Sequence, residues 1–377
     1  MFTERTSVGL DVHARSITAA AIDTDTDEIT RRKMMTADHF LEVLAFLASL
    51  AGPVAVVYEA GPTGYGLART LREHGYRCEV AAPSRLPRKP GDRRKTDPRD
   101  ALKLANALRA DQVTSVVVPS IEREDARDLT RTFEDSRVEL MAARHRLSKM
   151  LLRRGLVYYD GKTWTGAHDR WLRAQRGLLS GYGTLASFDD YYETVVVQTA
   201  RRKRLEKMII EYAADSEFTV MTRRLACLKG ISTVSAFALT VEIGDWDRFT
   251  GASIGAYLGL AAGERSSGAS IVRGPITKDG NTHARRLLTE AAWHHTPNYR
   301  AGTVLRRRWE DVDDPAVAVR AHAGNRRLSA RRSRLLDRGL DARKVNTAIA
   351  RELAGWCWSL AVLGHAVDDQ EAAQVTC

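Results

Sequence analysis

The chain has 377 residues, which at the usual ~150 residues per domain predicts two or three domains. Hydrophobic residues make up 44% and charged residues 28%, a balance that excludes a wholly disordered chain or a collagen-like fibre. Lys and Arg exceed Asp and Glu by 58 to 47, a net charge of +11. This excess favours a polyanionic partner such as nucleic acid, because each cation set against a phosphate releases condensed counterions. An ordinary basic enzyme is the alternative.

The sequence carries no membrane or export signal that we recognise. Residues 1–7 lack the apolar segment of a secretory signal, and the uncharged stretch 250–263 is shorter than the ~18 apolar residues that a bilayer span needs. The four cysteines lie far apart, without metal-binding spacing, as expected of reduced thiols: Cys78, Cys227, Cys357 and Cys377. We therefore expect a soluble cytoplasmic protein that does not enter a membrane.

The first hundred residues alternate between strand and helix signals. Short apolar runs predict strands at 7–13, 17–23, 28–34, 53–59 and 77–82, and helical spacing predicts helices at 38–50 and 64–74. The helix at 38–50 has an apolar stripe: Phe40, Leu41, Leu44, Leu47 and Leu50. Three antiparallel strands followed by strands that alternate with helices predict a mixed α/β sheet, in a domain at residues 5–118.

A basic loop interrupts this pattern at residues 83–95, where three prolines and six basic residues accompany a single acid, Asp92. Arg93, Arg94 and Lys95 are candidates for nucleic-acid binding. A solvated linker is the alternative, because charge runs are often no more than that.

The middle of the chain, residues 119–218, has a helical heptad pattern. A 3-4 spacing of seam residues predicts one long helix that packs in a coiled coil: Ala126, Leu129, Phe133, Ser136, Leu140, Ala143, Leu147 and Met150. Residues 161–183 are predicted to be irregular, and 191–213 to be helical again. Both an antiparallel hairpin within the chain and a dimer between chains fit this pattern.

A third region at 219–300 begins with two apolar helical stretches joined at Gly230, Ile231 and Ser232. This spacing is typical of a helix–hairpin–helix, whose backbone N–H groups can bind a phosphate, and equally of a plain helical hairpin in a core. Beyond it, residues 301–377 form an arginine-rich extension that is predicted to be helical. The sequence assigns no role to its 301–344 segment.

Four acidic residues are candidates for metal binding. Asp11 interrupts an apolar strand, where a carboxylate is costly unless it is paired or faces solvent. Glu59 ends a strand at the sheet edge that favours ligands. Asp97 is a good helix N-cap before Pro98, and Asp100 lies three residues on, on the same helix face.

Together, an Asp in the first strand, a Glu at a strand end and two acids opening a later helix match the RNase H/RuvC-like nuclease pattern. Such sites gather carboxylates because hard divalent ions prefer oxygen ligands. A pair of Mg²⁺ ions can activate a nucleophile and stabilise the leaving oxygen of a phosphodiester.

Motifs at both ends of the chain resemble the insertion sequence 110 (IS110) family of transposases, which includes the Piv-type invertases. VGLDVH (8–13), VYEAGPTG (57–64) and KTDPRDA (95–101) are similar to its N-terminal DEDD domain. LxxLxGIS (225–232), EIGDWDRF (242–249), AYLGLAAGERSSG (256–268) and ITKDGNTHARRLLTEAA (276–292) are similar to its C-terminal transposase domain. The heptad region matches the coiled-coil insertion between the two domains.

The resemblance implies site-specific DNA recombination guided by a structured bridge RNA that the element encodes. It implies that Asp11, Glu59, Asp97 and Asp100 bind Mg²⁺, and that a C-terminal serine attacks DNA and forms a phosphoserine. We favour Ser267 for this role over its neighbour Ser266. A serine hydroxyl needs a base or metal to activate it, and the nearest histidine in sequence, His283, is sixteen residues away.

We therefore expect the acids of one domain and the serine of the other to form a composite active site, across the protomers of a dimer or tetramer. Lys278, Arg285 and Arg286 are candidate phosphate contacts for the donor and target DNA. The alternatives are a RuvC-type nuclease that uses water, with an inert Ser267, and a catalytically inactive nucleic-acid-binding protein.

Overall fold

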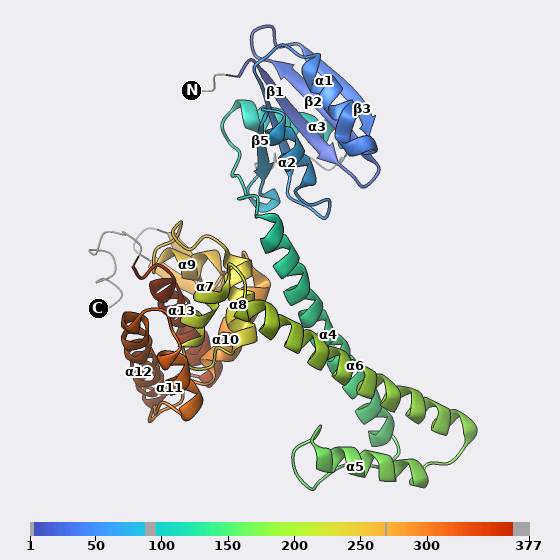
Figure 1. Cartoon of the computed structure of the whole chain (residues 1–377), viewed down its shortest axis with the longest axis vertical. Coiled ribbons are helices and arrows are strands. Elements are labelled where there is room, and N and C mark those ends of the chain that lie inside the picture. The colour runs from blue at the N-terminus through green and yellow to red at the C-terminus, as the bar shows by residue number, and fades with distance from the viewer. Residues whose placement is uncertain (1–3, 87–95, 268–269, 365–377) are drawn as a thin grey trace. The chain divides into compact units, whose positions relative to one another are not determined.

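The computed structural model describes residues 4–86, 96–267 and 270–364, and the chain divides into two compact units at Ser120 and Ile121 (Figure 1). The first unit holds the sheet and the second is mostly helical. Among the described residues, every helix is too short or too polar to cross a bilayer.

The sheet of the first unit has five strands in the order β3-β2-β1-β4-β5. They are β1 (Thr6–Val12), β2 (Ser16–Asp23), β3 (Ile29–Met35), β4 (Val54–Glu59) and β5 (Arg77–Ala81). Strands β1 to β3 pair antiparallel, whereas β1, β4 and β5 run parallel. The predicted mixed sheet is confirmed, and the fold is of the RNase H/RuvC-like class.

Helices cover both faces of this sheet. Helices α1 (Leu41–Ala48) and α2 (Gly66–Glu73) share one hydrophobic core with β1 and β4, which includes Val8, Leu10, Val56 and Tyr58. Helix α3 (Asp97–Arg109) covers the other face, where Leu104 and Leu108 contact Ala55 and Val57. Strand alternation therefore assigns even-numbered residues of β4 to α1 and α2, and odd-numbered ones to α3.

The helix expected at 38–50 differs at its start. A 3-10 turn, η1 (Asp38–Phe40), precedes α1, and His39 and Phe40 have positive φ angles of 53° and 65°. Because the α-helix begins only at Leu41, its buried stripe is Val43, Phe46 and Leu47. Leu41, which we expected in the stripe, is 60% exposed.

In the second unit, α4 (Ile121–Leu152) and α6 (Tyr182–Ala214) lie side by side (Figure 1). The end of α4 packs on Phe188 near the start of α6, whereas Ala126 near the start of α4 packs on Ile209 and Ala213 near the end of α6, so the two helices are antiparallel. Every predicted seam residue is buried or half-buried. The heptad face is thus used in a hairpin within one chain.

The hairpin contains one helix that we did not expect. Residues 161–183 were predicted to be irregular, but α5 (Gly166–Gln175) and the 3-10 turn η3 (Arg176–Leu178) lie there. Thr165 caps α5 by accepting a hydrogen bond from the His168 N–H, and Leu172 joins the core of the hairpin. Its short length and flanking glycines conceal this helix in the sequence.

The rest of the second unit is a helical body with one β-hairpin. It comprises α7 (Thr219–Ala226), α8 (Thr233–Ile243), α9 (Ser253–Tyr257), β6 (Ala262–Ser267), β7 (Ser270–Ile276), α10 (Thr282–Ala292), α11 (Thr303–Glu310), α12 (Pro315–Asp337) and α13 (Ala342–Ala361). The arginine-rich segment beyond residue 300 is helical, as predicted. It shares one hydrophobic core with α7, α8 and α10, so its described part is integral to this body.

The junction of α7 and α8 is a packed helical turn. A Cβ at Gly230, whose φ is +86°, would lie 2.4 Å from the carbonyl oxygen of Ala291. The N–H of Lys229 donates to Asn325 Oδ1 at 2.8 Å, and that of Ile231 to the Leu228 carbonyl at 3.2 Å. Because these N–H groups already have partners inside the protein, the geometry favours the core helical hairpin over a phosphate-binding turn.

Candidate active site

A close approach of β1 and α3 places the acids of these two elements together. A Cβ at Gly9 would lie 2.0 Å from the carbonyl oxygen of Ala101 and 2.4 Å from the backbone nitrogen of Ala105, so only glycine fits there. Asp11 lies two residues further along the strand and therefore on the same face. It thus faces the first turn of α3, where Asp97 and Asp100 lie.

Asp11 and Asp97 form a compact group with His13. The Nε2 atom of His13 lies 3.2 Å from Asp11 Oδ2 and 3.7 Å from Asp97 Oδ1. One ligand atom from each of the three residues lies within 4.8 Å of the others, which is close enough for a single metal ion. Sequence reasoning missed His13, although it ends the motif that contains Asp11.

Asp100 supplies a carboxylate oxygen that lacks a partner. Its Oδ1 atom accepts a hydrogen bond from Lys103 Nζ at 3.3 Å, whereas Oδ2 is buried and has no hydrogen-bond partner among the described residues. Burial raises the pKa of Asp11, the neighbouring His13 opposes this, and the charges of Asp97 and Asp100 raise it further. Asp100 is thus close enough to Asp11 for their charges to interact.

Glu59 reaches the same sheet edge from β4. Leu10 of β1 pairs with Tyr58 of β4 in parallel register, so the next residues, Asp11 and Glu59, are neighbours where the two strands end. Glu59 follows Ala55 and Val57 on the α3 side of the sheet by alternation. It is exposed and stands outside the group of Asp11, His13 and Asp97. The fold therefore gathers all four predicted acids on one face of one edge.

The start of α3 differs slightly from the prediction. Asp97 is the first helical residue rather than the N-cap, and the cap position is held by Thr96 in extended conformation, without a side-chain hydrogen bond. Pro98 follows in the first turn, where its missing N–H costs nothing. The Asp97 carboxylate is thus left for His13 instead of capping the helix.

The donor set at this edge fits a divalent ion. The carboxylates of Asp11 and Asp97 lie close enough to share an ion, and Asp100 beside them has a buried oxygen without a partner in the described part of the chain. Such a set suits a hard cation, because these ions prefer oxygen ligands and offset the repulsion between acids. His13 adds a nitrogen donor. The basic residues Arg93, Arg94 and Lys95 lie outside the described residues.

The candidate serines lie in the β-hairpin of the second unit. Ser266 and Ser267 end β6, and Ser267 pairs with Ser270 of β7. The structure describes the backbone of these two serines but not their side chains. The base of the hairpin is fixed, because the N–H of Thr277 donates to Ala261 and that of Lys278 to Gly259, at 2.9 and 3.1 Å.

The candidate phosphate contacts differ in how available they are. Lys278 is exposed, with a φ of +61°. Arg285 donates to the carbonyl oxygens of Leu258 and Asp279 at 3.0 and 2.8 Å, which fixes the loop before α10. Arg286 pairs with Glu290 at 2.7 Å and with Glu134. To bind a phosphate, Arg286 must leave these two carboxylates.

A buried carboxylate that the sequence did not reveal links the α4–α6 hairpin to the helical body. Glu242 of α8 is 3% exposed and accepts hydrogen bonds from Arg131 of α4 at 3.1 Å and from Asn281 at 2.7 Å, with His283 Nδ1 at 3.4 Å. Burial alone would raise the pKa of Glu242, but these hydrogen bonds and the Arg131 charge lower it to about 2.

Comparison with known proteins identifies both parts of the chain. A model of the DEDD domain of IS110 transposases, described as "Transposase", matches residues 8–154, and one described as "Transposase IS116/IS110/IS902 family" matches residues 222–306. A Sinorhizobium fredii protein that carries the name transposase y4qE is 38% identical over 305 residues, which cover 81% of this chain and 74% of that protein. The chain belongs to the IS110 family of insertion-sequence transposases.

A second relative supports the same assignment over more of its own length. The Leptospira borgpetersenii protein named "Transposase for insertion sequence element IS1533" is 29% identical over 350 residues, 87% of this chain and 98% of that protein. As an IS110-family transposase, the protein acts on DNA. Its DEDD domain implies a divalent metal, and the acidic edge at Asp11 and Asp97 is where this chain offers ligands.

Proposed function

We propose that this transposase cuts and rejoins DNA through a phosphoserine formed by Ser267, with Mg²⁺ held by Asp11, Glu59, Asp97 and Asp100. The observation that carries the metal assignment is the gathering of these acids at one sheet edge, beside a buried Asp100 oxygen for which residues 4–86, 96–267 and 270–364 supply no partner. Bound there, a divalent ion supplies charge stabilisation for a phosphodiester and activates a nucleophile.

The residues of the first unit prepare this site before any ion binds. Packing of Gly9 against Ala101 fixes the distance between β1 and α3, and hence that between Asp11 and Asp97. Burial, with the charges of Asp97 and Asp100, raises the pKa of Asp11, so its charge is unfavourable in the metal-free fold and a bound cation would offset that cost. His13 contacts Asp11 through Nε2, at 3.2 Å from Asp11 Oδ2.

A covalent adduct with DNA tests the serine assignment. The full-length protein is incubated with MgCl₂, with DNA from the ends of the insertion sequence and with RNA transcribed from its noncoding flank. The sample is then denatured, and DNA that remains linked to the protein is quantified on a gel. We expect an adduct with the wild type and with Ser266→Ala, and none with Ser267→Ala. An adduct lost only with Ser266→Ala would move the role to its neighbour. DNA cleavage that continues in both variants without an adduct would support water-dependent hydrolysis instead.

We further propose that an element-encoded structured RNA guides the reaction and that the protein acts as a homo-oligomer, a dimer or tetramer. The net charge of +11 and the family membership support an RNA partner. Sequencing of RNA that copurifies with the protein is the test. We expect one discrete transcript from noncoding DNA beside the gene, whereas random fragments would contradict guidance.

A further inference from the structure

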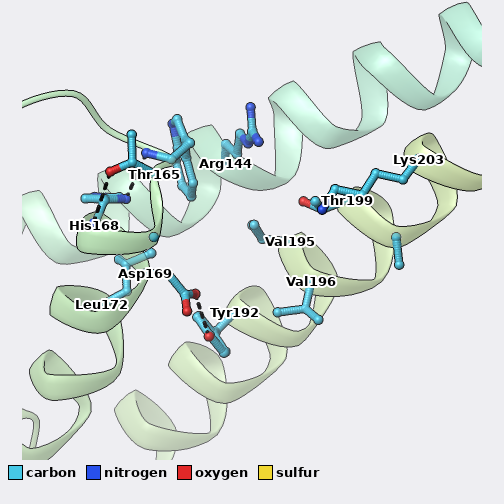
Figure 2. A pocket seen from close by; sticks show the side chains of 13 residues that line it. Arg144, Thr165, His168, Asp169, Leu172, Tyr192, Val195, Val196, Thr199 and Lys203 are labelled. Atoms are coloured by element: carbon cyan, nitrogen blue, oxygen red, sulfur yellow. Dashed lines mark hydrogen bonds between the residues drawn. The ribbon is translucent and has the colours of Figure 1, made fainter. Parts of the chain in front are cut away.

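A pocket of about 450 Å³ lies between α4, α5 and α6 in the helical hairpin (Figure 2). Its lining combines two cations, Arg144 and Lys203, with the aromatic rings of Trp164 and Tyr192 and with apolar Leu172 and Val195. The pocket belongs wholly to the second unit and uses none of the acids or serines considered above. Its volume is within the range of small-ligand sites and suffices for one nucleotide.

The two cations of the pocket lack acidic partners. In the described part of the chain, neither Arg144 nor Lys203 forms a salt bridge, and the Nε atom of Arg144 is buried without a hydrogen-bond partner. Burial, with the nearby charge of Arg202, lowers the pKa of Arg144. A half-buried guanidinium without a carboxylate is costly, so an anionic ligand would be favoured here.

The aromatic side of the pocket is held in a strained conformation. Trp164 has a φ of +63°, a backbone conformation that is rare and strained for an aromatic residue. The backbone N–H of Trp164 donates to Nδ1 of the buried His168 at 3.1 Å, and the Arg144 guanidinium lies 4.9 Å from the centre of the Trp164 ring. His168 stacks in turn on Trp171. The Arg144 guanidinium thus lies over the Trp164 ring as a stacked pair, and the outer face of such a pair is the kind of surface on which a base stacks.

Asp169, the one acid among the described residues that line the pocket, is already engaged. Asp169 accepts a hydrogen bond from the Tyr192 hydroxyl at 2.8 Å (Figure 2). It also pairs with Arg173 at 2.8 Å. It therefore does not neutralise Arg144, but it fixes the Tyr192 ring at the wall. An apolar floor, a flat cationic surface and unpaired positive charge together match a planar ring that carries a phosphate.

We propose that this pocket binds one unstacked nucleotide of a single-stranded nucleic acid, with its base against Trp164 and Arg144 and its phosphate at Arg144 and Lys203. A base in a duplex is enclosed in its stack and cannot enter, so the pocket discriminates single from double strands. The proposal rests on the proposed function only in taking the ligand to be a nucleic acid. RNA and DNA share the chemistry that the pocket requires, because both present a base and a phosphate.

Binding of short oligonucleotides tests the proposal on the full-length protein. Fluorescence anisotropy in EDTA measures the Kd of a labelled single-stranded 12-mer, as RNA and as DNA of one sequence, and of the DNA duplex. The pocket pair Arg144→Ala/Lys203→Ala is compared with a matched pair, Arg146→Ala/Arg204→Ala. The matched residues are exposed, lie on the same two helices and do not line the pocket.

We expect the pocket pair and Trp164→Ala each to raise the single-strand Kd about tenfold, a typical cost of losing one stacked base. The matched pair should raise it by no more than about threefold, and no variant should change duplex binding selectively. Tighter binding of RNA than DNA would assign the nucleotide to an RNA strand, and the reverse to a displaced DNA strand; both outcomes support the pocket.

If the pocket pair and the matched pair lost single-strand affinity equally, the proposal would be overturned, because the loss would then reflect net charge alone. Duplex affinity that falls as much as single-strand affinity would overturn it as well. Circular dichroism melting checks that Trp164→Ala folds. If it does not, the single variant Lys203→Ala replaces it in the binding assay, because Lys203 is exposed. The binding assay contains EDTA and depends on no covalent adduct, so a failed adduct experiment and a failed pocket are told apart.

Discussion

Gly9 of β1 lies so close to Ala101 of α3 that a Cβ would come within 2.0 Å of the Ala101 carbonyl oxygen. We predict that Gly9→Ala pushes α3 away from the sheet, because the nearest atoms are backbone and cannot rotate aside. Overpacking of this kind costs about 1–3 kcal/mol or more. The change should lower the unfolding midpoint and weaken divalent-metal binding together, as measured by thermal unfolding with and without MgCl₂.

Gly66→Ala provides the control for this variant. Gly66 begins α2, and a Cβ there would meet nothing within 4 Å. Alanine should therefore be neutral or slightly stabilising, by about 0.4–1 kcal/mol. If Gly9→Ala behaved like Gly66→Ala, the close contact of β1 with α3 would not control the position of the acids.

Asp11→Asn should separate the effect of the Asp11 charge on stability from its role in binding a metal ion. Because the pKa of Asp11 is raised on folding, the protonated carboxyl stabilises the fold at low pH, and this contribution is lost as the pH rises through the folded pKa. At neutral pH the ionised carboxylate therefore destabilises the metal-free fold. At pH 7.5 the asparagine variant should melt higher than the wild type without metal. With MgCl₂ at tenfold its Kd, the wild type should gain roughly 5 °C and the variant little.

Asp111→Asn is the matched control, because Asp111 is exposed in the same unit and has a φ of +54° that asparagine tolerates. It should melt like the wild type and keep the full response to MgCl₂. An Asp11→Asn protein that is still stabilised by Mg²⁺ as strongly as the wild type would contradict the assignment of Asp11 as a ligand.

How far the sequence predicts this site depends on whether the relevant contacts are local. Strand alternation and the end of an apolar run were enough to single out Asp11 and Glu59, because sheet register then brings them together. His13 was not predicted, since its position depends on the turn in which its N–H donates to Ser16. Nothing in the spacing shows that this turn directs His13 back toward Asp97.

The helical part shows the same division between local and distant information. The heptad predicted α4 correctly, but a 3-4 spacing states only that a helix has an apolar face and not which helix covers it. Glu242 looks like an unfavourable acid in an apolar helix. Its burial is explained by the hydrogen bonds that it accepts from Arg131, more than a hundred residues away in sequence, and from Asn281 at the cap of α10.

The packing of the heptad face predicts how the α4–α6 hairpin responds to mutation. Leu147 is fully buried against α5 and α6, so Leu147→Ala should cost about 2–5 kcal/mol. Met141, on the same helix, is 43% exposed, and Met141→Ala should cost little. Because the seam is covered within one chain, the oligomeric state should not change with Leu147→Ala in sedimentation velocity. Dissociation of an oligomer would show that the seam also joins chains.

The lowered pKa of Glu242 predicts that the second unit loses stability at acid pH. Its pKa falls from an ordinary 4.5 to about 2 on folding, a shift that corresponds to about 3 kcal/mol of stability. A lowered carboxyl pKa stabilises the fold above the unfolded value, and that contribution is lost as pH falls from about 4.5 toward 2. Glu242→Gln should therefore be less stable at pH 7, measured by urea unfolding, and the deficit should shrink below pH 4.5.

The exposed Glu193 of α6 has no partner among the described side chains, so Glu193→Gln should follow the wild type at every pH. A Glu242→Gln deficit that stays constant from pH 7 to pH 3 would mean that shape, rather than charge, makes Glu242 important. A deficit that shrinks with acid would instead show that the ionised carboxylate joins Arg131 of the α4–α6 hairpin to Asn281, the cap of the helix that follows the β-hairpin of Ser267.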